Sequence, residues 1–157
     1  MDEFSAAIAE ELFADFPEWR IFAQELKADD GSQYLVVEVP SPKEADTPNG
    51  ILITTNDTEI TVSFDGYHSH FRHWRTTEPA DYYRAAYVFV RSILNESVAI
   101  ASWWNGERCL GASQVINGEL FHMHFNFSRI RVRSWRGRHN KLSRTNGDLD
   151  ADGSIRA

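Results

Sequence analysis

The strongest constraint on the fold is a series of short segments rich in β-branched and aromatic residues, separated by polar turns. GILITT and EITVSF flank the triplet NDT, and Ile60, Val62 and Phe64 alternate with polar residues in the second segment. A period of two places the apolar side chains on one face of a strand. Asn-Gly pairs at 105–106 and 117–118 favour two-residue hairpins. Because such short turns join antiparallel strands, the sequence predicts a mostly antiparallel sheet.

Helices are predicted at two places. Residues 5–16 carry apolar side chains at helical spacing and are followed by Pro17. A second amphipathic helix begins near Pro79 and extends to about Asn95. The expected strands are 19–26, 33–39, 50–55, 59–64, 97–104, 107–116, 120–127 and 129–135. A helix fits residues 19–26 equally well.

These elements predict an α+β fold. An N-terminal helix and one central helix would pack on a mostly antiparallel sheet of about six to eight strands. Residues 1–139 are expected to form a single α+β domain. Residues 140–157 contain few apolar side chains, so we expect a flexible C-terminal tail there.

Charge is divided unevenly along the chain, whose formal net charge is −7 at pH 7. Residues 1–80 hold 16 acidic and 5 basic residues, a net of −11, and residues 81–157 hold 7 and 11, a net of +4. Phosphate repels an acidic surface, so we expect no direct nucleic-acid partner. The acidic half favours a basic protein partner through electrostatic steering. A solvated surface that maintains solubility is the alternative.

The sequence predicts a cytoplasmic protein with no membrane partner. No apolar run approaches the roughly 20 residues of a membrane span. The first residues, MDEFSAAIAEELF, lack the basic and then apolar order of a signal peptide. Cys109 is the only cysteine, which excludes an intrachain disulfide and a zinc site built from cysteines. We expect Cys109 to be a small core residue rather than a reactive thiol.

Five of the six histidines lie in two short clusters. His68 and His70 share one face if the strand continues beyond Phe64, and His122 and His124 repeat the spacing in a later predicted strand. Two such pairs on neighbouring strands would offer imidazole ligands to zinc or iron. Alternatively, the rings pack against aromatic neighbours or line the polar face of a sheet. Walker, G-x-G-x-x-G and H-E-x-x-H motifs do not occur in the sequence.

Seven basic residues lie between Arg129 and Arg144, with Trp135 among them. Interleaved aromatic residues are typical of proteins that bind single-stranded nucleic acid. The interpretation we favour is instead that these charges are solvated or pair with the acidic half of the chain. Trp103 and Trp104 are adjacent on a predicted strand, so one should face the core and the other the opposite face.

Three segments together resemble a group of small bacterial immunity proteins from contact-dependent growth inhibition and polymorphic-toxin systems. They are GILITTNDTEITVSFDGYHSHF, the strand with a W-x-x-x-x-C/L pattern around residues 101–110, and RIRVRSWRGRHN. The first is the most specific, and its F-D-x-Y-H-x-H-F pattern is carried by Phe64, Asp65, Tyr67, His68, His70 and Phe71. The resemblance covers roughly residues 33–139 apart from the polar loop.

The resemblance implies an antidote without enzymatic activity or cofactor, which binds the C-terminal toxin domain of a large secreted effector and blocks its active site. A basic nuclease is a typical toxin of this kind. We expect the contacts to include Asp65, Tyr67, His68, His70 and Trp74, because this segment combines residue types common at interfaces. The alternative is a small metal- or histidine-dependent enzyme that uses the two His-x-His pairs.

Overall fold

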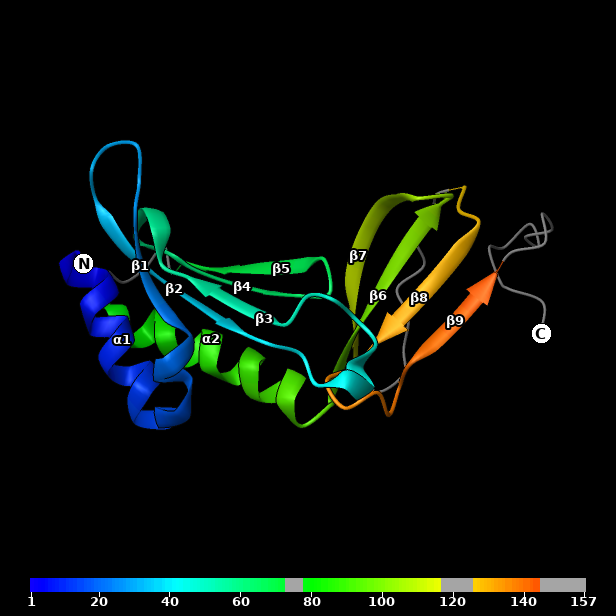
Figure 1. Ribbon diagram of the computed structural model, residues 1–157, viewed down its shortest axis with the longest axis horizontal. Helices are drawn as coiled ribbons and strands as arrows, with labels where there is room; N and C mark the ends of the chain where they lie inside the picture. The colour runs from blue at the N-terminus through cyan, green and yellow to red at the C-terminus, as the bar shows by residue number, and fades with distance from the viewer. Residues whose placement is uncertain (73–77, 117–125, 145–157) are drawn as a thin grey trace. The chain divides into compact units, whose positions relative to one another are not determined.

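The computed structural model describes residues 1–72, 78–116 and 126–144, which form two compact units. Unit 1 comprises residues 1–41 and 48–92, and unit 2 comprises residues 42–47 and the described residues from 93 onward. The predicted α+β class is confirmed, with an N-terminal helix, one central helix and antiparallel strands (Figure 1). The strands divide between a five-stranded sheet in unit 1 and a four-stranded sheet in unit 2.

The elements of unit 1 follow one another along the chain as a helix, five strands and a second helix. They are α1 (Glu3–Asp15), η1 (Pro17–Phe22), β1 (Ala23–Lys27), β2 (Gln33–Val39), β3 (Ile51–Thr54), η3 (Asn56–Thr58), β4 (Ile60–Phe64), β5 (Tyr67–Phe71) and α2 (Pro79–Leu94). Unit 2 contains η2 (Lys43–Ala45), β6 (Val98–Asn105), β7 (Arg108–Ile116), β8 (Arg129–Arg133) and β9 (Lys141–Arg144). No helix in the described ranges is both long and apolar enough to cross a membrane.

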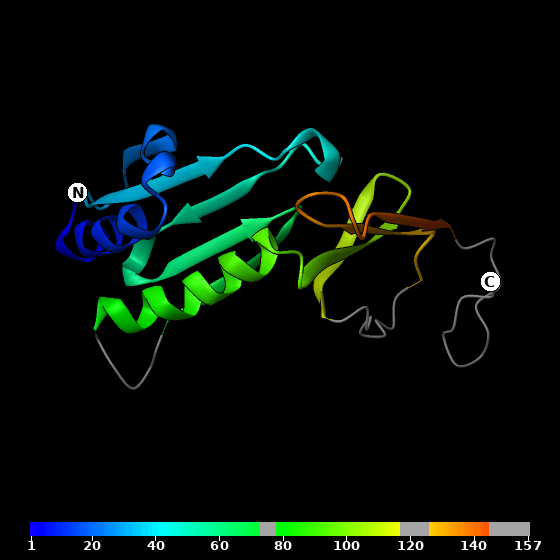
Figure 2. The same cartoon turned by 90° about the horizontal axis from the view of Figure 1, so that it is seen from below.

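The sheet of unit 1 is an antiparallel meander in the order β1-β2-β3-β4-β5. Its strands alternate as the sequence predicts, and Ile60, Val62 and Phe64 are buried while Thr61 and Ser63 are half-buried. Both helices lie on the face that carries the buried residues (Figure 2). The sheet is therefore covered on one side by α1 and α2.

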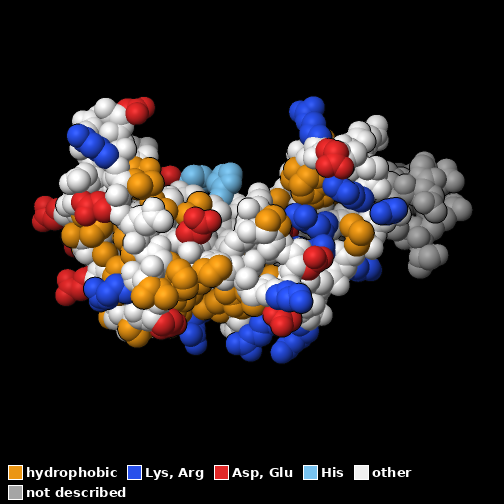
Figure 3. Space-filling model, viewed as in Figure 1, with side chains coloured by type: hydrophobic (Ala, Val, Ile, Leu, Met, Phe, Trp, Pro, Cys, Tyr) orange, Lys and Arg blue, Asp and Glu red, His pale blue; other side chains and the backbone are white. Residues whose placement is uncertain are grey.

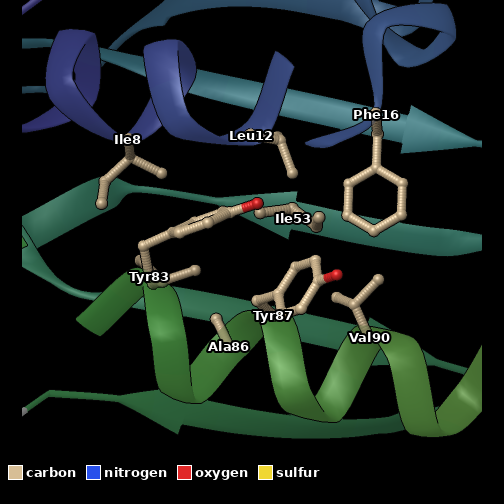
Figure 4. Close-up of a pocket in the computed structure, with 9 residues that line it drawn as sticks. Ile8, Leu12, Phe16, Ile53, Tyr83, Ala86, Tyr87 and Val90 are labelled. Carbon is tan, nitrogen blue, oxygen red and sulfur yellow. The ribbon is translucent and has the colours of Figure 1, made fainter. Parts of the chain in front are cut away.

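The core of unit 1 lies between this covered face and the two helices. Side chains from α1, β3, β4 and α2 converge there and leave a cavity of only about 10 Å³ (Figure 4). The lining is entirely apolar apart from tyrosine hydroxyl groups, and the Tyr83 hydroxyl donates a hydrogen bond to Oδ2 of Asp15 at 2.6 Å. This space belongs to a packed core and has the size of about one water molecule.

A tight turn at Asp65-Gly66 joins β4 to β5. Phe64 pairs directly with Tyr67, and both turn residues have positive φ, 46° for Asp65 and 83° for Gly66. Two central residues with positive φ are typical of the type I′ hairpin turn, for which Asp-Gly is a favoured sequence. The chain therefore reverses after Phe64, and β5 is a separate strand at the edge of the sheet.

The sheet of unit 2 has the order β7-β6-β8-β9, and the predicted Asn105-Gly106 turn joins β6 to β7. The second predicted turn, at 117–118, lies outside the described residues. Trp103 is buried in a cluster with Ala99, Ala101, Val115, Ile130 and Val132. Trp104 is half-buried and lies on the opposite face, which confirms the prediction for this pair.

Three local predictions differ from the structure. The segment 19–26 is half 3-10 helix and half strand, because Pro17 starts the short helix η1 and β1 begins only at Ala23. Residues 141–144, which we expected in the tail, form β9 and pair with β8. Cys109 is exposed rather than part of the core. It pairs with Trp104 next to a register shift between Trp103 and Trp104, and its strand β7 lies at the edge of the sheet.

Candidate partner-binding face

The face of the five-stranded sheet opposite the helices carries outward side chains from all five strands. This open face consists of Gln24, Leu26, Tyr34, Val36, Glu38, Leu52, Thr54, Thr61, Ser63, His68 and His70. Directly paired residues of antiparallel strands share a face, which is why the register fixes this set. All of these side chains are exposed or half-buried, and within the described ranges no helix lies over them.

The composition of the open face is mixed, with apolar side chains toward β1 to β3 and polar ones toward β5. Leu26 is exposed, and Tyr34, Val36 and Leu52 are half-buried. Neither lysine nor arginine is among the residues that define this face. The polar residues are those expected on the solvated face of an antiparallel sheet, and the four apolar side chains are the part of the face that a partner could bury.

His68 and His70 lie together at the β5 end of the open face, as their spacing predicts. Their rings meet edge to face with centroids 5.0 Å apart. Nδ1 of His70 lies 2.7 Å from Oε1 of Glu59 and 3.0 Å from Oγ1 of Thr61. Figure 3 shows histidine side chains at the surface of unit 1. The contacts to Glu59 and Thr61 hold the His70 ring in one orientation while half of the side chain stays exposed.

The other predicted contact residues lie elsewhere. Asp65 is 1% exposed in the β4–β5 turn, and Tyr67 points to the covered face, where its ring meets Phe89 at 6.1 Å. A side chain one position from His68 must point to the opposite face of the strand, so Tyr67 is not available for a contact on the open face. Trp74 lies outside the described residues. Of the five candidates, His68 and His70 are thus the two that the open face presents.

Only one of the two His-x-His pairs predicted to bind a metal lies among the described residues. His68 and His70 are adjacent, but His122 and His124 lie outside the described residues. Within the described ranges, no group of three or more His, Cys, Asp or Glu residues is arranged to hold a metal ion. The metal hypothesis therefore stays a prediction.

The acidic residues of the chain belong mostly to unit 1. Its two segments, 1–41 and 48–92, contain 15 acidic and 6 basic residues, a net of −9. Most of the described acidic side chains of α1 and of the β1–β2 loop are exposed. The negative electrostatic field of these exposed side chains attracts a basic partner and raises its rate of association.

Two arginines of the basic run form ion pairs inside unit 2. Nη2 of Arg133 lies 2.6 Å from Oδ2 of Asp46, and Nε of Arg138 lies 3.4 Å from Oε2 of Glu96. Arg133 also donates from Nε to the backbone oxygen of Asp46, so it fixes the η2 segment to this unit. These pairs agree with the interpretation that part of the basic run neutralises acidic residues.

Glu96 is a structural centre that the sequence analysis missed. It is 5% exposed, and its Oε1 accepts hydrogen bonds from Oγ of Ser134 at 2.7 Å and from the backbone N of Arg136 and Arg138 at 2.9 and 3.2 Å. Burial raises the pKa of Glu96, but these hydrogen bonds and the charge of Arg138 outweigh burial and lower it overall. Glu96 lies two residues after the end of α2, and its φ of +62°, unusual for a glutamate, is visible only in the structure.

No protein-family model, no curated protein and no solved structure matches this chain.

Proposed function

We propose that this protein is an immunity protein, an antitoxin that binds and neutralises the toxin domain of a bacterial contact-dependent growth inhibition or polymorphic-toxin system. The open face of unit 1 is the observation that carries the proposal. A partner that covers this face would bury the exposed Leu26 and the half-buried Tyr34, Val36 and Leu52. The resemblance of the β3–β5 segment to immunity proteins supplies the class of partner.

The mechanism we infer is occlusion rather than catalysis. The net charge of −9 on unit 1 steers a basic toxin domain toward the protein. On contact, the aromatic and aliphatic side chains of the open face supply buried area, and His68 and His70 supply hydrogen-bonding groups at its edge. A few such anchors carry most of the affinity of a typical interface. The antidote would act in the cytoplasm, where the toxin reaches its target.

Co-expression with the product of the adjacent upstream reading frame tests the function itself. We expect growth rescue and a stable one-to-one complex on co-purification. A toxic upstream product that is neither bound nor neutralised by this chain contradicts the proposal.

A double variant, His68→Ala with His70→Ala, tests the choice of site. We expect the affinity for the toxin domain to fall at least tenfold, because both exposed rings would lie in the interface. His139→Ala is the matched control, since His139 is exposed on unit 2 and donates a hydrogen bond to Oγ of Ser134 through its backbone N, which the substitution keeps. Equal affinities for the double variant and the wild type would place the interface elsewhere.

A further inference from the structure

Three arginines and one tryptophan gather on one face of the unit 2 sheet. Arg129 of β8 pairs directly with Trp104 of β6 on one side and with Arg144 of β9 on the other, so these three share a face. Arg131 lies two residues farther along β8 and points the same way. The guanidinium carbons of Arg129 and Arg131 each lie 5.0 Å from the centroid of the Trp104 ring. We call these four residues the arginine face.

The pairing of Arg129 with Arg144 is electrostatically unfavourable without an anion. Like charges directly opposite each other on neighbouring strands destabilise a sheet, and Arg129 and Arg144 are such a pair. Among the described residues, no carboxylate lies within ion-pair distance of either side chain. Arg133 and Arg138 of the same unit instead pair with Asp46 and Glu96.

We propose that the arginine face binds single-stranded nucleic acid. Guanidinium groups neutralise phosphates, and guanidinium planes that lie over an aromatic ring form with it a platform on which bases stack. An acidic peptide would satisfy the charges equally well, but it would bring no ring to stack against Trp104 or the guanidinium planes. The exposed side chain of Leu142, opposite Arg131 on β9, extends the apolar part of the same surface.

The net negative charge of the chain does not oppose this assignment locally. The acidic excess that argued against a nucleic-acid partner belongs to unit 1. Residues 93–144 contain 3 acidic and 8 basic residues, a net of +5. The inference is independent of the proposed toxin binding on unit 1.

Fluorescence anisotropy with labelled dT12 and U12 and the purified full chain tests the proposal. We expect dissociation constants on the order of 10 µM at 50 mM salt. If Arg129 and Arg144 each neutralise one phosphate, the slope of log K against log salt is about −1.4, from −0.7 per phosphate on a single strand. Changing Arg129 and Arg144 together to Gln should remove most of this slope and weaken binding at least tenfold.

The matched control changes Arg84 and Arg91 of α2 to Gln, two exposed arginines outside the arginine face. It alters the net charge equally and should leave binding within twofold of the wild type. Equal losses in the two double variants, or no binding of dT12 at 100 µM protein, overturn the proposal.

An abasic 12-mer and a 12-residue oligoglutamate identify the ligand class. Stacking of one base predicts that the abasic strand binds roughly five- to a hundredfold more weakly than dT12. Trp104→Leu should weaken dT12 by a similar factor and leave the abasic strand unchanged, with the fold checked by circular dichroism. Oligoglutamate that binds as tightly as dT12 contradicts the proposal and assigns the surface to an acidic protein.

Discussion

The loop that closes unit 2 is predicted to depend on the charge of Glu96. One carboxylate oxygen accepts three hydrogen bonds from residues 134–138, and Ser134 in turn accepts from the backbone N of His139. Glu96→Gln keeps the shape and one acceptor oxygen but removes the charge. Charge-assisted hydrogen bonds are roughly twice as strong as neutral ones, so we expect a loss of about 2 kcal/mol in the free energy of unfolding. Glu96→Ala removes the acceptor altogether and should cost about 3–5 kcal/mol.

The backbone of Glu96 allows a second, independent check. Its φ of +62° is in the left-handed region, which costs an L-residue with a side chain roughly 1–2 kcal/mol. Glu96→Gly loses the same hydrogen bonds as Glu96→Ala but relieves this strain. The glycine variant should therefore be about 1 kcal/mol more stable than the alanine variant.

The pH dependence follows from the lowered pKa of Glu96. Because its pKa is lower in the folded than in the unfolded protein, the stabilisation is complete above the ordinary glutamic acid range and is lost as the pH falls through the folded value. The stability difference between wild type and Glu96→Gln should thus shrink on acidification from pH 7 to pH 3. Urea unfolding followed by tryptophan fluorescence measures it, because Trp103, Trp104 and Trp135 all belong to unit 2.

The control is Glu107→Gln, at an exposed glutamate in the β6–β7 turn. It should change stability by less than about 0.5 kcal/mol. The reasoning is refuted if the two Gln variants are equally stable at pH 7, or if the deficit of Glu96→Gln persists undiminished at pH 3.

Three further predictions concern other parts of the molecule. Gly137→Ala should destabilise unit 2 by more than about 2 kcal/mol in urea unfolding, because a Cβ there would lie 2.1 Å from the backbone oxygen of Glu44 and φ is +75°. Tyr83→Phe should cost about 1 kcal/mol in the same assay, since it removes a single part-buried hydrogen bond to Asp15. Elemental analysis of tag-free protein should find less than about 0.1 zinc or iron per chain, and a stoichiometric metal lost on His68→Ala would favour the enzyme hypothesis instead.

Local patterns predicted much of the fold. The alternation in 60–64, the Asn105-Gly106 turn and the helix from Pro79 are recovered with bounds within a residue or two. These features depend on short-range backbone preferences and on period, which sequence carries directly. The Asp65-Gly66 turn is a signal of the same kind, and its recognition would have identified β5 as a separate strand.

What the sequence did not predict depends on contacts between distant segments. The division of the strands into two sheets is one example, and the place of residues 42–47 in unit 2 is another. That segment is a polar loop in the sequence, yet Ala45 is fully buried and Asn140 donates hydrogen bonds to the backbone oxygens of Glu44 and Ala45. The role of Glu96 could not be predicted for the same reason, because the groups that donate hydrogen bonds to its carboxylate lie about 40 residues away in the sequence.

The candidate site was predicted in part. The period of two correctly placed His68 and His70 on one face, and the same rule places Tyr67 on the other. The rest of the open face comes from β1, β2, β3 and β4, whose register no local pattern specifies. The predicted contacts all came from the segment 65–74, which contributes only the β5 edge of the open face. The apolar side chains on β1, β2 and β3 were therefore not predicted.

The most direct test of the open face compares Glu38→Lys with Glu10→Lys in binding to the toxin domain. Both glutamates are exposed in unit 1, Glu38 on the open face and Glu10 on α1, so the two variants change net charge equally. Isothermal titration calorimetry should show a loss of at least thirtyfold in affinity for Glu38→Lys and no more than about threefold for Glu10→Lys. Equal effects of the two variants would mean that the toxin senses only the charge of unit 1 and does not contact the open face.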